Sequence, residues 1–207
     1  MKFLSAFRYE LGGEHTYEFV QGTVPHDLPI ELAPLSNPGG QHFSYYDVGS
    51  SASFIAALDN LESYIETEGP FDGALAYSQG AGLIAMLLVR RQYLKPREQP
   101  LFRCAILFSP VQLYDPVAYL ERGEVSVLDQ LAPGVACLPL PVVIVYGEAD
   151  ERRQECRGVQ NVCDQALLSV FAHEGGHEVP GIGVKGGLVG TVRAARRGLT
   201  RAEMEVV

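Results

Sequence analysis

A serine between two small residues marks the position where this sequence most strongly indicates nucleophilic chemistry. Ser78 has Ala76 and Gly80 on either side, and it follows the apolar run 71–77 and precedes a helical pattern that begins at Gln79. A sharp turn from strand to helix needs small residues at those flanking positions, because larger side chains would meet the neighbouring backbone. Such a turn presents the hydroxyl at a helix N-terminus, where the backbone amide of Gln79 can donate to a developing oxyanion. The alternative is a serine that only caps the helix.

A serine hydroxyl becomes an effective nucleophile when a neighbouring base removes its proton. Two histidines, His173 and His177, follow Ser78 in the chain. His177 lies in the glycine-containing loop 173–180, beyond the last predicted strand, from which an imidazole can reach back over a sheet. We favour His177 as the base over His173, which ends that strand.

A catalytic imidazole also needs an acid that fixes its tautomer and stabilises its protonated form. Asp150 follows the Val- and Ile-rich run 142–146, where a strand is expected to end, and we assign it this role. Asp115 and Asp129 are competitors, but Asp115 stands in a Tyr-Asp-Pro turn, where an aspartate has a local function. Asp164 precedes the last predicted strand and therefore lies at the opposite end of the sheet.

Strand-like and helix-like segments alternate along the chain, which favours a mostly parallel, twisted sheet with helices on both faces. The amphipathic or apolar helical patterns cover residues 53–66, 79–94 and 187–197. Strands are predicted at residues 15–20, 71–77, 101–108, 141–146 and 166–172. No composition shift separates these segments, so we expect a single α/β domain over residues 1–207.

The bulk composition excludes several classes of function. A net charge of −9 disfavours electrostatic binding to nucleic acid or to anionic membranes. The four cysteines form no C-x-x-C pair, so no zinc site or other metal is expected. No apolar run is long enough to cross a bilayer, and the N-terminus does not resemble a signal peptide. We therefore expect a cytoplasmic protein.

With these residues in hand, the sequence resembles the fungal FSH-type serine hydrolases of the α/β-hydrolase superfamily, which include esterases and thioesterases of polyketide pathways. The resemblance implies hydrolysis of carboxylic esters or thioesters of small acyl or polyketide substrates through an acyl-serine, without a cofactor. It also implies a monomer or homodimer whose partner is a small-molecule substrate or an acyl carrier protein. The segments that carry it are residues 8–12, 17–20, 68–73, 77–81 and 175–180.

One departure from this family concerns the N-terminal strand. Family members begin with a strand that leads into a Leu-His-Gly loop, whereas here residues 1–4 resemble the start of that strand and residues 5–9 already resemble the later helix. No His-Gly pair occurs in the sequence, so the strand is expected to be truncated. The loop would supply the second oxyanion-hole amide, and losing one such donor typically costs about 10²–10³ in turnover.

Because of this departure, we also consider functions other than ester hydrolysis. A hydrolase-like protein of impaired activity that binds a ligand or a partner is the main alternative, and a lyase or cyclase that reuses the same three residues is another. Tyr45 and Tyr46 lie in the long loop 22–49, which should approach the carboxyl edge of the sheet. We expect them either to line an acyl pocket or to anchor this loop.

Overall fold

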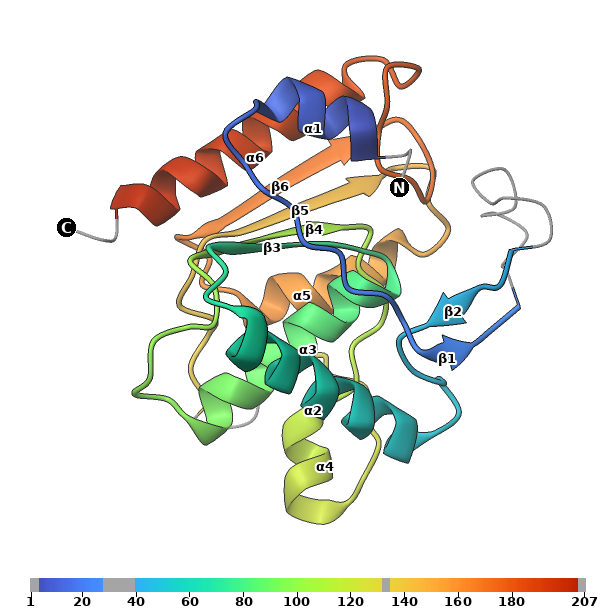
Figure 1. Cartoon of the computed structure of the whole chain (residues 1–207), viewed down its shortest axis with the longest axis vertical. Helices are drawn as coiled ribbons and strands as arrows, with labels where there is room; N and C mark the ends of the chain where they lie inside the picture. The colour runs from blue at the N-terminus through green and yellow to red at the C-terminus, as the bar shows by residue number, and fades with distance from the viewer. Residues whose placement is uncertain (1–3, 28–39, 132–134, 205–207) are drawn as a thin grey trace.

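A four-stranded parallel sheet in the order β3-β4-β5-β6 lies at the centre of the computed structural model, which describes residues 4–27, 40–131 and 135–204 (Figure 1). The strands are β3 (Gly73–Tyr77), β4 (Cys104–Phe108), β5 (Val142–Gly147) and β6 (Leu168–His173). Tyr77 pairs with Phe108, Phe108 with Val145 and Val145 with Phe171. The strands therefore finish at a common carboxyl edge, as the sequence predicts, and each predicted strand from residue 71 onward is confirmed within three residues.

Helices cover both faces of the sheet, which confirms the predicted α/β-hydrolase architecture (Figure 1). One face carries α2 (Ser51–Glu68), α3 (Gln79–Leu94) and α5 (Cys156–Val162), and the other carries α1 (Ser5–Leu11) and α6 (Gly187–Met204). The alternation of β-strand side chains divides the core accordingly: in β4, Ala105 and Leu107 pack toward the first face, and Ile106 and Phe108 toward the second. The remaining elements are α4 (Pro116–Arg122), the 3₁₀ turn η3 (Arg153–Glu155) and the short antiparallel pair β1 (Val24–Pro25) and β2 (Phe43–Ser44).

Helix α3, which follows Ser78, is the most deeply buried helix. Every residue of α3 from 80 to 90 is buried, which matches the sequence pattern of a helix that is apolar nearly all round. In α6 the side chains of Arg193, Arg196 and Arg197 lie on the exposed side, again as predicted. Among the helices of the described segments, none has both the length and the apolar character that a bilayer span requires.

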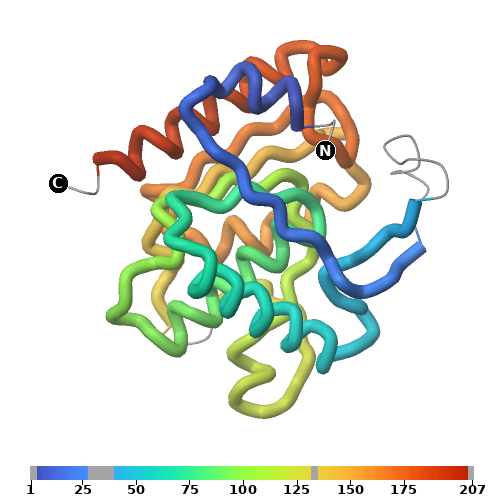
Figure 2. Tube along the Cα trace, in the orientation of Figure 1, coloured from blue at the N-terminus to red at the C-terminus, as the bar shows by residue number. Residues whose placement is uncertain are grey.

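The predicted strand over residues 15–20 is wrong, because in the described part of the chain no strand pairs with this segment. Helix α1 packs on α6, whereas Glu18 accepts a hydrogen bond from Tyr64 Oη of α2 at 3.1 Å. The intervening chain passes from one face of the sheet to the other on the side of β3 (Figures 1 and 2). Leu4 begins a helical turn rather than a strand, and residues 1–3 of the expected strand lie outside the described residues.

Aromatic side chains of this crossing segment contact a cation instead of a strand neighbour. The guanidinium of Arg8 lies 4.1 Å from the ring centroid of Tyr17 and 5.5 Å from that of Phe19. Contacts of this kind between arginine and aromatic faces stabilise by about 0.5–1 kcal/mol at exposed sites. They attach the extended segment to α1 without any β-ladder.

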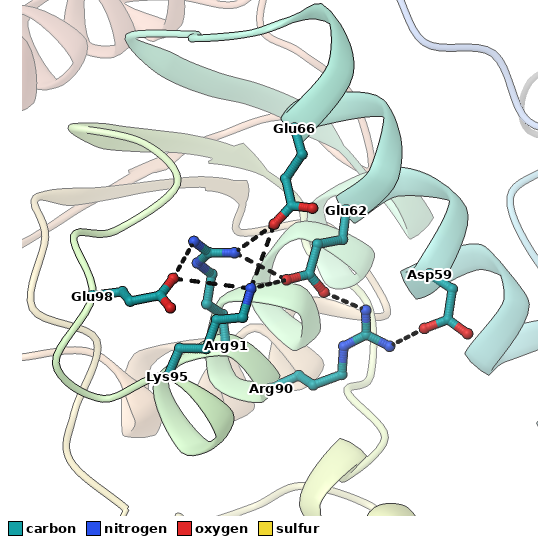
Figure 3. A network of polar contacts seen from close by, with 7 residues as sticks. All are labelled: Asp59, Glu62, Glu66, Arg90, Arg91, Lys95 and Glu98. Carbon is teal, nitrogen blue, oxygen red and sulfur yellow. Dashed lines mark hydrogen bonds and ion pairs between the residues drawn. The ribbon is translucent and has the colours of Figure 1, made fainter.

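A network of charged side chains joins α2 to α3 (Figure 3). Arg90 is only 4% exposed, and its guanidinium donates to Asp59 and to Glu62, both at 2.6 Å. Glu62 also accepts from Arg91 at 3.0 Å. A buried guanidinium is tolerated when its N–H groups are paired, so Glu62 holds two adjacent cations at the helix interface. The other members of the network are Glu66, Lys95 and Glu98.

Replacing Glu62 should therefore destabilise the fold more than replacing Asp59. Glu62→Gln removes the carboxylate that the two arginines share, and we expect a loss of about 1–3 kcal/mol in the free energy of unfolding. The Asp59 side chain is 63% exposed, so Asp59→Asn should cost less than about 1 kcal/mol. Urea denaturation of the two variants and the parent checks this order; equal losses would contradict it.

Candidate active site

Ser78 lies at the turn between β3 and α3, with φ 54° and ψ −119°. A positive φ is uncommon for a residue with a Cβ, and such strain persists where the surroundings impose it. The Ser78 amide donates to the Phe108 carbonyl at 2.9 Å, which extends the β3–β4 ladder by one bond. The hydroxyl does not cap α3, so the alternative of a purely capping serine does not apply. The turn aims this hydroxyl away from the helix backbone.

The imidazole of His177 contacts both of the other predicted residues. Its Nε2 lies 2.8 Å from Ser78 Oγ, and its Nδ1 lies 2.7 Å from Asp150 Oδ2. These three residues are separated by 99 and 27 positions in the chain. The structure thus brings them into one continuous hydrogen-bonded relay at the carboxyl edge of the sheet.

Asp150 is almost completely enclosed, with 3% of its surface exposed. Its second carboxylate oxygen, Oδ1, accepts from the backbone N–H of Arg152 at 2.8 Å. A buried carboxylate needs such donors, because burying an unpaired charge is costly. The carboxylate is therefore held on both sides, by the imidazole and by its own turn.

The competing acids have local functions. Asp115 is the N-cap of α4 and accepts from the backbone amides of Val117 and Ala118 at 2.9 and 3.1 Å. Asp164 accepts from the amide of Ala166 at 2.8 Å. These carboxylates bond to backbone amides of their own turns, whereas the carboxylate of Asp150 bonds to the imidazole of His177.

Backbone contacts hold the loop of the acid against the loop of the histidine. The amide of Glu148 donates to the His173 carbonyl at 2.7 Å, and that of Ala149 donates to the Gly175 carbonyl at 3.0 Å. A Cβ at Gly147 would collide with the carbonyl oxygens of Gly175 and Gly176. Only glycine permits this close approach at the end of β5.

Two polar residues at the same edge were not predicted. Tyr77 Oη donates to the His177 carbonyl at 2.7 Å, and the two rings lie 5.4 Å apart. Ser109 follows β4 as Ser78 follows β3, has φ 40° and is 1% exposed. Among the described residues its hydroxyl has no hydrogen-bond partner. The signal that could have indicated Ser109 is its position directly after a buried apolar run.

The side chain of Gln79 ties the helix start to the long loop. Its Oε1 accepts from the Tyr45 amide at 2.8 Å, and its Nε2 donates to the Tyr46 carbonyl at 2.9 Å. The Tyr45 ring packs over Gly80, and its hydroxyl donates to the Val20 carbonyl at 3.0 Å. The Gln79 backbone N–H belongs to the first turn of α3, where amides have no intrahelical acceptor.

The prediction that Tyr45 and Tyr46 line an acyl pocket needs correction for Tyr46. This side chain is 2% exposed and packs edge-on against Phe54 and Tyr114, so it anchors the loop in the core and has no surface to offer a substrate. Burial raises its pKa above the usual range for a tyrosine. For Tyr45, which is partly buried beside Gly80, contact with substrate stays a prediction.

Comparison with known proteins assigns this geometry to a family. The family model described as "Serine hydrolase (FSH1)" matches residues 3–182. The chain belongs to this serine hydrolase family. Esterase FPY3 of Fusarium mangiferae is 32% identical over 190 residues, covering 87% of this chain and 82% of the relative. Hydrolase phiM of a fungal species is 29% identical over 171 residues, covering 81% and 72%.

Solved structures support the fold of this serine hydrolase. Arabidopsis thaliana SOBER1 superposes with a TM-score of 0.52 at 13% identity, covering 95% of this chain and 91% of the other. A Bacillus cereus carboxylesterase gives a TM-score of 0.50 at 17% identity, covering 84% and 82%. At these identities the likeness concerns the α/β-hydrolase fold and not the substrate.

Thiols in this serine hydrolase are poor competitors for the role of nucleophile. Cys104 is buried, as its apolar surroundings predict, and burial raises the pKa of its thiol to about 11. Cys156 lies beside the site, and burial together with the charge of Asp150 raises its pKa to about 12. A thiol reacts as the thiolate, which neither residue supplies near neutral pH. In the described segments no cluster of three or more His, Cys, Asp or Glu side chains could hold a metal ion.

His173, the histidine not chosen as base, is 3% exposed and is a structural residue of the histidine loop. Its Nδ1 accepts from the Gly175 amide at 3.1 Å, so protonation of Nδ1 would break this contact. Burial lowers the pKa of the imidazole, although the carboxylates of Glu178 and Asp150 act in the opposite direction.

The neutral state of His173 predicts a loss of stability in mild acid. In the unfolded chain a histidine binds a proton near pH 6.5, whereas the folded protein resists protonation of His173. Below about pH 6.5 the unfolded state therefore takes up more protons, and stability falls as the pH decreases. Thermal melts at pH 7.5 and pH 5.5 should show a smaller drop in Tm for His173→Asn than for the parent; an unchanged drop would contradict the assignment.

Proposed function

We propose that this serine hydrolase cleaves carboxylic esters through an acyl-serine intermediate, with Ser78 as nucleophile, His177 as general base and Asp150 as the orienting acid. The single observation that carries the proposal is the relay of 2.8 Å and 2.7 Å between these three side chains. Its chain order of serine, acid and histidine is also typical of α/β-hydrolases.

The contacts assign a role to each atom of the imidazole. A carboxylate only accepts hydrogen bonds, so Nδ1 of His177 carries the proton toward Asp150 and leaves the lone pair of Nε2 for the Ser78 hydroxyl. When Oγ attacks the carbonyl carbon, its proton moves to Nε2, and the nearby carboxylate stabilises the resulting imidazolium. The imidazolium then protonates the leaving alkoxide or thiolate. Water, deprotonated by the same imidazole, hydrolyses the acyl-serine and restores the hydroxyl.

The oxyanion of the tetrahedral intermediate needs backbone donors close to Ser78. We assign one of them to the N–H of Gln79, which stands at the N-terminus of a 16-residue helix whose dipole favours negative charge. The Gln79 side chain bonds to Tyr45 and Tyr46, which fixes the residue that carries this amide. No cofactor is needed for this chemistry.

The names of the relatives support an ester substrate. Three of them, from Fusarium mangiferae, Caenorhabditis elegans and Emericella nidulans, are called esterases. We extend the proposal to thioesters of small acyl or polyketide chains, delivered free or on an acyl carrier protein. Attack of the serine on an ester or on a thioester gives the same acyl-serine. Comparing kcat/KM for a p-nitrophenyl ester with kcat/KM for an acyl-CoA of the same chain length distinguishes esterase from thioesterase activity.

The alternative function, ligand binding by an impaired hydrolase, rests on one observation. The sequence lacks the Leu-His-Gly loop, and in the described part of the chain β3 pairs only with β4. The second oxyanion donor of the family is therefore not supplied in the usual way. Turnover of a p-nitrophenyl ester near that of an uncatalysed control, with Ser78 unreactive, would favour this alternative.

Covalent labelling of Ser78 tests the nucleophile. A fluorophosphonate should phosphonylate the protein at one equivalent, and Ser78→Ala should abolish both labelling and ester hydrolysis, because the hydroxyl that bonds to the imidazole is removed. Ser109→Ala is the matched control, since Ser109 also lies after a strand but is not bonded to the imidazole. Labelling that persists in Ser78→Ala would overturn the proposal.

Exchanging the acid for its amide tests the orientation of the imidazole. Asp150→Asn should retain the fold but lower turnover by about 10⁴, because the amide favours the wrong tautomer of His177. Asp115→Asn serves as control, since asparagine caps helices as well as aspartate does. Steady-state hydrolysis of the two variants distinguishes the assignments: a large loss in Asp115→Asn and none in Asp150→Asn would exchange them.

A further inference from the structure

We propose that Glu155 is a positioning residue of the relay: its carboxylate holds the turn that carries Asp150 and adds a second negative charge to this turn, whose Asp150 contacts His177. The inference rests on the proposed roles of Ser78, His177 and Asp150.

Glu155 forms an ion pair within the turn of the acid. Its Oε1 and Oε2 accept from Nε and Nη2 of Arg152, both at 2.9 Å. This two-point geometry restricts a guanidinium more than a single contact does. The backbone N–H of the same Arg152 donates to Asp150 Oδ1 at 2.8 Å. Glu155 therefore fixes the residue whose amide supports the carboxylate of the acid.

The same carboxylate also reaches across to a distant part of the chain. Glu155 Oε2 accepts from the backbone N–H of Gln112 at 2.6 Å, across 43 positions of sequence. The neighbouring thiol of Cys156 donates to the Pro110 carbonyl at 3.5 Å. Residues 155 and 156 thus connect the acid turn to the segment that follows Ser109 at the end of β4. Both sides of the carboxyl edge are joined at this point.

Charge gives Glu155 a second effect on the imidazole. Although partial burial raises its pKa, the hydrogen bonds from Arg152 and Gln112 and the nearby charge of a protonated His177 lower the pKa of this carboxyl overall, which keeps it ionised. Hydrogen bonds join Glu155 to Arg152, Arg152 to Asp150 and Asp150 to His177, so the charge of Glu155 favours the imidazolium that forms during the reaction. The described groups in direct contact with the imidazole are Ser78, Asp150 and Tyr77, and the ion pair of Glu155 with Arg152 lies in the turn that carries Asp150.

The pH dependence of the reaction separates this role from a purely structural one. Glu155→Gln retains the shape of the side chain but removes its charge and leaves the Arg152 cation uncompensated. Both effects disfavour the imidazolium, so the acid limb of the kcat/KM profile should move to lower pH by about half a unit. The plateau should fall by about tenfold as the acid turn loosens. A purely structural defect would lower kcat/KM without shifting the acid limb of its pH profile.

The experiment measures p-nitrophenyl butyrate hydrolysis and the rate of Ser78 labelling by a fluorophosphonate between pH 4.5 and 9. Glu151→Gln is the matched control, because it removes one charge from an exposed side chain in the same turn; it should leave profile and plateau unchanged. Glu155→Asp keeps the charge at shorter reach, so it should lower the plateau and leave the acid limb in place. Elevated salt should reduce the shift in Glu155→Gln.

The outcomes distinguish this inference from the proposed function. Profiles of Glu155→Gln that coincide with those of Glu151→Gln would overturn the inference, while activity that still depends on Ser78 would leave the proposed function intact. If Ser78→Ala were fully active, the proposed function itself would fail. If Glu155→Gln does not fold, Glu155→Asp provides the test. A kcat/KM plateau in Glu155→Asp equal to that of the parent would overturn the positioning role.

Discussion

The contact between the Ser78 hydroxyl and the His177 imidazole depends on strands that finish at the same level. Tyr77, Phe108 and Val145 stand in register across β3, β4 and β5, so the residues after them emerge at one edge. Core packing on both faces holds these strands in place, with α3 beneath and α6 above. The positive φ of Ser78 then directs the hydroxyl toward the loop of the histidine. Loss of register by one residue would turn these side chains to the opposite face.

Much of this arrangement could be predicted because buried parallel strands and tight turns leave local signals. The strand Val142–Gly147 is a continuous run of apolar residues that ends in a turn with Asp150, and the small residues Ala76 and Gly80 mark the serine turn. Glu155 could not be found in this way. Its contact with Gln112 joins residues that are far apart in sequence, and neither belongs to a recognisable pattern. Tyr46 gave no signal that distinguished a core position from a pocket wall.

The failed strand prediction over residues 15–20 concerns the same N-terminal region as the second oxyanion donor expected from the family resemblance. Tyr17 and Phe19 have strand-forming side chains, but a strand exists only with a partner, and no strand of the described residues pairs with this segment. Tertiary context therefore overrode local propensity. The Leu-His-Gly loop expected from the resemblance belongs to the same N-terminal region, and no His-Gly pair occurs in the sequence.

The close approach at Gly147 has a consequence for how the site responds to a substrate. Since the backbones of the acid and histidine loops are bonded to each other through Ala149 and Gly175, the backbone itself fixes part of their spacing. The dipoles around the imidazole are therefore already oriented before any ligand arrives. Little reorganisation energy has to be added to the barrier when charge develops, which is the condition under which electrostatic preorganisation is most effective.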